Sequence, residues 1–212
     1  MKQQDKRNRI CFGLGTVGRD MLYAFEANTI LYFLSDVLSL QIWEFAAVSM
    51  ILSVLRIFDA LNDPITGFVI DNIRSPWGKF KPAILVGGAL SAVFFLMLFA
   101  NIGTGWTFII VFGVAYLLWD ITYGINDIGY WTLLPAMSSD QKQREKMGTF
   151  ARICANIGMY IVMVAWQPVT SALGDTPKVW FCCTLVIAVI FLLGLLFPLL
   201  GVKERRTAPE EQ

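Results

Sequence analysis

Apolar residues along the chain fall into six long blocks that short polar segments separate. The blocks have about 20 residues or more, roughly what an α-helix needs to cross ~30 Å of hydrocarbon. We therefore predict an all-α membrane protein with six transmembrane helices, at about residues 10–34, 42–70, 82–101, 106–135, 149–172 and 179–202. They would form one bundle over residues 1–202, followed by a charged cytoplasmic tail at 203–212.

Composition supports this interpretation and narrows the chemistry. Hydrophobic residues make up 56% of the chain and charged residues 16%, a balance unsuited to a water-exposed surface. With a net charge of +1 and dispersed basic residues, the chain has no dense patch for nucleic acid. It has no histidine, no phosphate-cradling glycine loop and no metal-ligand spacing, so we predict that it is not an enzyme and needs no cofactor.

Lysine and arginine are concentrated on one side of the predicted membrane. The polar N-terminus runs into a first block too long for a signal peptide, which predicts a retained anchor. Basic residues precede the first span and follow the even-numbered spans. This distribution predicts that both termini are cytoplasmic. We predict that the protein is integral to the plasma (inner) membrane. The residues on that side are Lys2, Lys6, Arg7, Arg9, Arg74, Lys79, Lys81, Lys142, Arg144, Lys146, Lys203, Arg205 and Arg206.

Nine charged residues lie well inside the predicted spans. A lone ionised side chain at the bilayer centre costs at least ~2.5 to 3.5 kcal/mol on insertion scales. These residues must therefore pair, become neutral or line a water-filled cavity. They are Arg19, Asp20, Glu26, Arg56, Asp59, Asp63, Asp120, Asp127 and Arg152.

The second span carries a candidate cation site. Arg56, Asp59 and Asp63 are three and four residues apart, which places them on one helix face within ~60°. Two carboxylates one turn apart, flanked by Asn62, offer oxygens to Na⁺, Li⁺ or a proton. The alternative is a structural lock in which an arginine and an aspartate only hold helices together.

The fourth span carries a candidate sugar site. Asp120, Tyr123, Asp127 and Trp131 return to one face at steps of three, four and four. Carboxylates accept hydrogen bonds from vicinal hydroxyls, and aromatic rings pack on the apolar side of a pyranose. The alternative is that these aromatic residues serve in packing or anchor the helix at the interface. The first span adds Asp20 and Tyr23, after closely spaced glycines that let helices approach.

Four runs of residues carry a resemblance to a known family: GRD at 18–20, RIFDALNDP at 56–64, RSPWGKFKP at 74–82 and YGINDIGYW at 123–131. With them the chain resembles the glycoside-pentoside-hexuronide:cation symporters of the major facilitator superfamily, and looks most like the melibiose-permease type. The resemblance covers nearly the whole sequence.

That resemblance implies roles for the charged residues. Asp59 and Asp63 would bind the coupling cation with help from Asn62. Arg56, Asp120 and Glu26 would be structural or coupling charges. The residues implied to hold the sugar are Asp20, Asp127, Tyr123, Trp131, Arg152 and Arg19.

The chain also departs from the family pattern. Gly124 stands where the melibiose type has a hydroxyl residue near the cation, Asp120 is an additional acid, and Arg19 replaces a lysine. These departures leave Na⁺, Li⁺ and H⁺ open as the coupling cation.

The resemblance implies cation-coupled secondary active symport of a sugar or glycoside. Because the family has twelve spans in two bundles, the chain corresponds to an N-terminal half. Its partner in the bilayer would be a second six-helix bundle, either a missing C-terminal half or a second copy. The alternative is a half-length membrane binding, scaffold or sensor protein that dimerises or regulates a partner without transporting.

Overall fold

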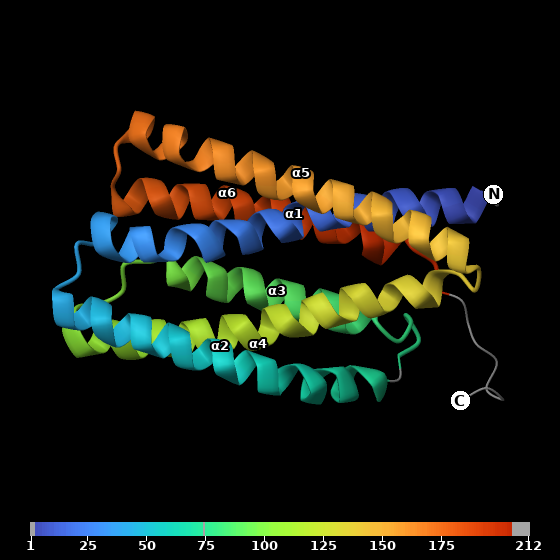
Figure 1. Ribbon diagram of the computed structural model, residues 1–212, viewed down its shortest axis with the longest axis horizontal. Coiled ribbons are helices and arrows are strands. Elements are labelled where there is room, and N and C mark those ends of the chain that lie inside the picture. Colours follow the sequence, from blue (N-terminus) through green and yellow to red (C-terminus); the bar gives the residue numbers. More distant parts are fainter. Residues whose placement is uncertain (1–2, 74, 205–212) are drawn as a thin grey trace.

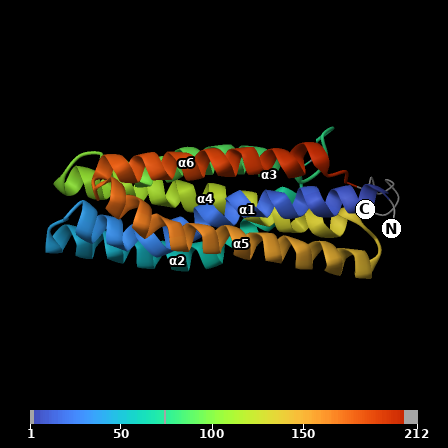
Figure 2. The ribbon, with the colours of Figure 1, turned by 90° about the horizontal axis from the view of Figure 1, so that it is seen from above.

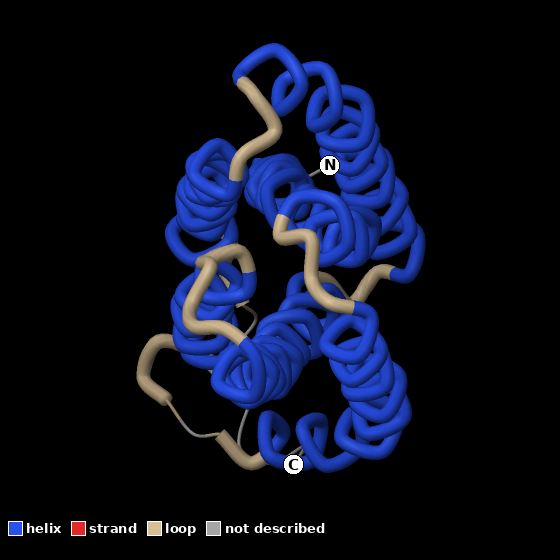
Figure 3. The backbone as a smooth tube through the Cα atoms, turned by 90° about the vertical axis from the view of Figure 1, so that its left-hand side faces the viewer, coloured by secondary structure: helices blue, strands red, loops and turns tan. Residues whose placement is uncertain are grey.

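The computed structural model describes residues 3–73 and 75–204, and all the regular structure within them is helical (Figures 1 and 3). The side chains of Ala60 and Leu61 also lie outside the described residues, as do the predicted basic positions Lys2, Arg74, Arg205 and Arg206 and the tail after Glu204. The helices are α1 (Gln3–Tyr32), α2 (Ile42–Asp71), α3 (Lys81–Leu98), α4 (Gly105–Met137), α5 (Gln141–Leu173) and α6 (Pro177–Leu196). Short π-helical segments, η1 (Phe33–Val37) and η2 (Phe197–Gly201), continue α1 and α6.

Two helices begin well before the apolar blocks that predict them. α1 starts at Gln3 and α5 at Gln141, where the Asp140 carboxylate accepts a hydrogen bond from the Lys142 backbone N–H at 3.0 Å. Helical hydrogen bonding does not need apolar side chains, and lysine, glutamine and arginine are good helix formers. Hydropathy therefore marks the part of a helix that suits lipid, while the helix itself continues into polar sequence.

By length and composition, four of the described helical segments can cross a membrane: α3, α4, α5, and α6 together with η2. α1 and α2 carry most of the charged residues that the sequence places inside spans, which lowers their mean hydropathy. Large apolar side chains are exposed on the outside of the bundle, among them Phe68, Tyr160 and Leu200. A surface of this kind matches hydrocarbon better than water.

The helices run along one common long axis (Figure 2) and divide between two sides of the bundle, with α1, α5 and α6 on one and α2, α3 and α4 on the other (Figure 1). α1 packs mainly on α5 and α6, whereas α2 packs on α4, and α3 lies against α4 and α6. Glycines allow the closest approaches on the α1 side. A Cβ on Gly18 would lie 2.7 Å from the Ile190 backbone oxygen of α6, and one on Gly158 would meet the backbone oxygen of Val17.

Hydrogen bonds at both ends of α1 hold it against α6 and the segments that flank α6. At one end Asn8 of α1 exchanges two hydrogen bonds with the backbone of Lys203, at 3.2 and 3.1 Å. At the other end Asp175 accepts hydrogen bonds from the Tyr32 hydroxyl, at 2.7 Å, and from the Trp180 indole N–H. These contacts fix both ends of α1 within its own side of the bundle, and a cavity lies between α1 and the α2–α4 pair.

Candidate functional site

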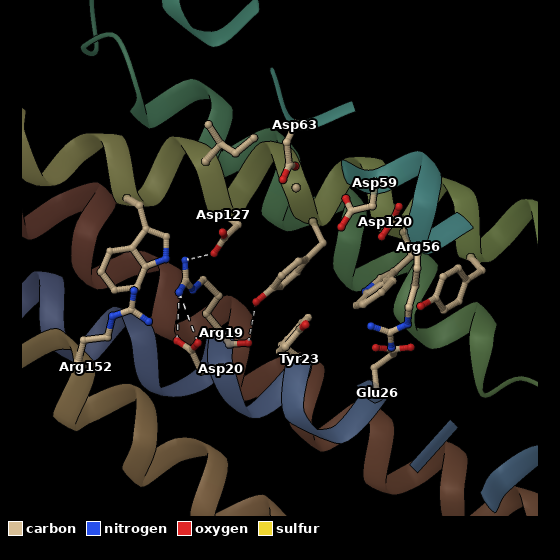
Figure 4. Close-up of a pocket in the computed structure, with 16 residues that line it drawn as sticks. Arg19, Asp20, Tyr23, Glu26, Arg56, Asp59, Asp63, Asp120, Asp127 and Arg152 are labelled. Carbon is tan, nitrogen blue, oxygen red and sulfur yellow. Dashed lines mark hydrogen bonds and ion pairs between the residues drawn. The ribbon is translucent and has the colours of Figure 1, made fainter. Parts of the chain in front are cut away.

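A cavity of about 400 Å³ lies between α1, α2 and α4, with Arg152 of α5 at one end (Figure 4). Its volume falls within the range of ligand-binding cavities. Every predicted site residue lines it except Asn62, which is half-buried beside it. The full lining is Arg19, Asp20, Tyr23, Glu26, Arg56, Asp59, Asp63, Tyr116, Trp119, Asp120, Tyr123, Gly124, Asp127, Ile128, Trp131 and Arg152.

At one end of the cavity, Arg19 holds two carboxylates in place. Its Nη1 donates to Asp127 Oδ1 at 2.6 Å, and its Nη2 donates to Asp20 Oδ2 at 3.2 Å. The Arg19 side chain is 1% exposed, whereas those of Asp20 and Asp127 are 16% and 40% exposed. A buried guanidinium therefore fixes two partly exposed acids that line the cavity, and their remaining lone pairs can accept hydrogen bonds from hydroxyl groups.

Aromatic rings surround the same end. The Arg19 guanidinium carbon lies 4.7 Å from the Tyr130 ring centroid and 5.1 Å from that of Trp131. The guanidinium carbon of Arg152 lies 4.4 Å from the Trp131 ring centroid. Cation–π contacts of this kind orient both the arginines and the indole. We call this region, with Arg19, Asp20, Asp127, Trp131 and Arg152, the Arg19 end.

The opposite part of the cavity contains Glu26, Arg56, Asp59, Asp63 and Asp120, and we call it the Arg56 end. In Figure 4 Tyr23 lies between Arg19 and Arg56. Within the described residues Arg56 forms no ion pair, since the pairs found there are Arg19–Asp20, Arg19–Asp127 and Lys79–Asp71. The alternative that Arg56 and an aspartate only hold helices together therefore has no ion pair to support it.

The two ends differ in their balance of charge. Counting ionised forms, the Arg19 end has two arginines, Arg19 and Arg152, for two aspartates, while the Arg56 end has one arginine for four acids. Among the described residues, no group of three or more His, Cys, Asp or Glu side chains is arranged to hold a metal ion. A cation at Asp59 and Asp63 would thus need further oxygens from the chain, water or substrate.

Five lining residues had no assigned role in the predicted site, and three of them are aromatic: Tyr23, Tyr116 and Trp119. Their rings and that of Tyr123 form a ladder, with centroid separations of 5.6 Å for Tyr23–Tyr123 and 5.5 Å for Trp119–Tyr123 and Tyr116–Trp119. Tyr116 lies one helical turn before Asp120 and two before Tyr123. Extending the predicted α4 stripe by one turn, from Asp120 to Tyr116 and from Tyr123 to Trp119, would have found these two aromatic residues.

Comparison with known proteins gives a consistent picture. A family model described as "MFS/sugar transport protein" matches residues 11–212. The raffinose carrier protein of Pediococcus pentosaceus is 31% identical over 92% of this chain and 33% of its own length. The lactose permease of Lactobacillus delbrueckii subsp. bulgaricus is 32% identical over 96% of this chain and 35% of its own length. The isoprimeverose transporter of Lactiplantibacillus pentosus is 25% identical over 93% and 42%. The chain thus spans about a third of the length of the first two relatives.

Proposed function

Because this chain belongs to the family of MFS/sugar transport proteins, as its sequence motifs predicted, we propose that it forms one six-helix bundle of a cation-coupled sugar symporter. It is an integral membrane protein, with four helical segments apolar enough to span the bilayer. In the proposal α1 and α2 span it as well, because their charges face the internal cavity and lipid touches their apolar sides. Both termini lie in the cytoplasm, as the distribution of lysine and arginine predicts.

The substrate is a sugar or glycoside bound at the Arg19 end. The observation that carries this proposal is the buried Arg19 clamp, which presents Asp20 and Asp127 to the cavity beside the Trp131 ring. Sugar hydroxyls would donate to the two carboxylates, and Arg152 would donate to a sugar oxygen. The names of the relatives, which refer to raffinose, lactose and isoprimeverose, agree with a substrate of this class.

The coupling cation, Na⁺, Li⁺ or H⁺, binds at Asp59 and Asp63, with Asn62 as a neighbour on the same helix. Support comes from the excess of carboxylates at the Arg56 end and from the absence of an ion pair to Arg56 among the described residues. A cation there reduces repulsion among the acids and so favours sugar in the adjoining part of the cavity. The expected coupling free energy is on the order of 1 to 3 kcal/mol and acts equally in both directions.

Transport requires a second bundle to close the other side of the cavity. In transporters built from paired bundles, one bundle rocks against the other around a site near the middle of the membrane. The second bundle would be further sequence of the same protein or a second copy of this chain. Uptake of labelled sugar into vesicles, with this chain alone and with a candidate second bundle, separates transport from binding without transport.

The decisive experiment is sugar binding to the chain in lipid nanodiscs. Lactose and raffinose would be titrated at neutral pH without added cation, with Na⁺, with Li⁺, and at acidic pH. We expect affinity to rise about fivefold or more with the coupling cation, as the coupling free energy implies. Identical affinities under all four conditions would reject coupling, and no binding under any of them would reject the sugar site.

A further inference from the structure

We propose that the Arg56 end is a second sugar subsite, formed by Glu26, Asp120 and Trp119, so that the substrate contains at least two linked sugar units. This inference rests on the proposed function, because it places the first unit at the Arg19 end. It assigns to Glu26, Asp120 and Trp119 a role that neither the sequence motifs nor the resemblance implies.

Buried polar atoms without partners point to a ligand at this end. Glu26 is 1% exposed, and its Oε1 has no hydrogen-bond partner among the described residues. Asp120 Oδ2 and the Trp119 indole nitrogen are also buried without a partner, and all three residues line the cavity. Because a buried polar group without a hydrogen bond destabilises a fold, such atoms mark the place of a missing partner.

The unpartnered atoms include both hydrogen-bond acceptors and a donor. Glu26 and Asp120 supply carboxylate oxygens, while the Trp119 indole N–H can only donate. A bare cation would satisfy the carboxylates and leave the indole N–H facing a positive charge. A hydroxyl group accepts one hydrogen bond while donating another, so a hydroxyl-rich ligand satisfies all three atoms.

The Arg56 end also repeats the chemistry of the Arg19 end. Each end combines an arginine, carboxylates on α1 and α4, and an α4 tryptophan: Asp20, Asp127 and Trp131 at one, Glu26, Asp120 and Trp119 at the other. The stacked Tyr23 and Tyr123 rings, 5.6 Å apart, lie along the path between them. Aromatic faces along this path can pack against successive sugar rings.

The second subsite and the cation site use different atoms of the Arg56 end. The cation is proposed at Asp59 and Asp63 of α2, whereas the sugar unit contacts α1 and α4. A sugar hydroxyl could complete the cation's oxygen ligands, since no three acidic side chains in the described part of the chain are arranged to hold a metal ion. A sugar long enough to reach the second subsite would then raise the affinity for the cation.

The test compares a one-unit sugar with a two-unit sugar in nanodiscs. Methyl α-galactoside and melibiose, with methyl β-galactoside and lactose as a second pair, are titrated in Na⁺ buffer against the wild-type chain, Glu26→Gln, Asp120→Asn and Trp119→Phe. Trp119→Phe removes the N–H donor and keeps a smaller aromatic face. We expect wild type to bind at least one disaccharide about tenfold more tightly than its methyl galactoside. Each variant should lose most of that preference, and Trp119→Phe, which changes no charge near the cation site, should keep its monosaccharide affinity within about twofold.

Two controls make the outcome decisive. Glu145→Gln changes an exposed carboxylate remote from the cavity and should leave all affinities unchanged. Asp127→Asn should weaken monosaccharide and disaccharide alike, and thermal unfolding identifies any variant that fails to fold. Wild type binding both sugar lengths equally, or variants that weaken both equally, overturns the second subsite and leaves the proposed function intact. Failure of wild type to bind any of the four sugars overturns both.

Discussion

The two ends of the cavity contain similar side chains but differ in how their arginines are paired with carboxylates. At the Arg19 end the guanidinium is 1% exposed and bonded to carboxylates on two helices. At the Arg56 end the arginine is exposed to the cavity and forms no ion pair with any described carboxylate. The carboxylates of the first end thus have a partner before a ligand arrives, whereas the second end lacks partners that a ligand and a cation would supply.

The largest effect should follow removal of the Arg19 clamp. In Arg19→Ala the Asp20 and Asp127 carboxylates lose their shared partner, which should lower the free energy of unfolding by about 3 kcal/mol. Sugar binding should be lost, and thermal unfolding together with lactose titration measures both effects. Arg19→Lys keeps the charge but not the two-pronged geometry and should fall between wild type and alanine. Wild-type stability in Arg19→Ala would show that the clamp is dispensable.

Replacing one carboxylate of the proposed cation site should remove the effect of the cation on sugar affinity without disturbing sugar binding at the Arg19 end. Asp63→Asn should abolish the dependence of sugar affinity on Na⁺, Li⁺ or acid. The sugar affinity measured with the cation present should therefore fall about tenfold. Affinity without cation should remain near the wild-type value, because the Arg19 end is unchanged. Asn62→Ala is the matched comparison: because Asn62 lies outside the cavity lining, its replacement should reduce the cation dependence less than Asp63→Asn does. Equal effects of the two variants would argue against an aspartate-based cation site.

Adding a hydroxyl group at Gly124 should tighten cation binding. Gly124 lines the cavity, and a Cβ placed there would meet nothing within 4 Å. Gly124→Ser therefore introduces a hydroxyl without a clash and should raise the Na⁺ dependence of sugar binding about fivefold, roughly the contribution of one hydrogen bond. Gly124→Ala controls for the added bulk. A gain in the alanine variant as large as in the serine variant would exclude the hydroxyl as its cause.

The smallest effect on stability should follow loss of Arg56. Because this arginine makes no ion pair with a described carboxylate, Arg56→Gln should change the free energy of unfolding by less than about 1 kcal/mol. Thermal unfolding beside Arg19→Gln tests the contrast directly. A loss in Arg56→Gln comparable to that in Arg19→Gln would mean that the two ends do not differ in the way the structure indicates.

Much of this arrangement could be predicted because it is local along the chain. A spacing of three and four residues places Arg56, Asp59 and Asp63 on one face of α2, and the same rule aligns Asp120 with Asp127 on α4. All five line the cavity. The cost of charge in hydrocarbon likewise predicts that such residues avoid lipid. The helix starts at Gln3 and Gln141 could not be read from hydropathy, which reports the surroundings of a helix and not its length.

The sequence by itself therefore determined the helices, their polar faces and the family. Tertiary structure alone decided which faces meet: Arg19 bonds to Asp127, 108 residues away, while Arg56 stays without an ion pair among the described residues. It also left Asn62 outside the cavity lining and set Arg152 of α5 at one end of the cavity. The physical reason is that helix periodicity orients side chains around one axis, whereas the distances between axes depend on packing such as that of Gly18 against α6.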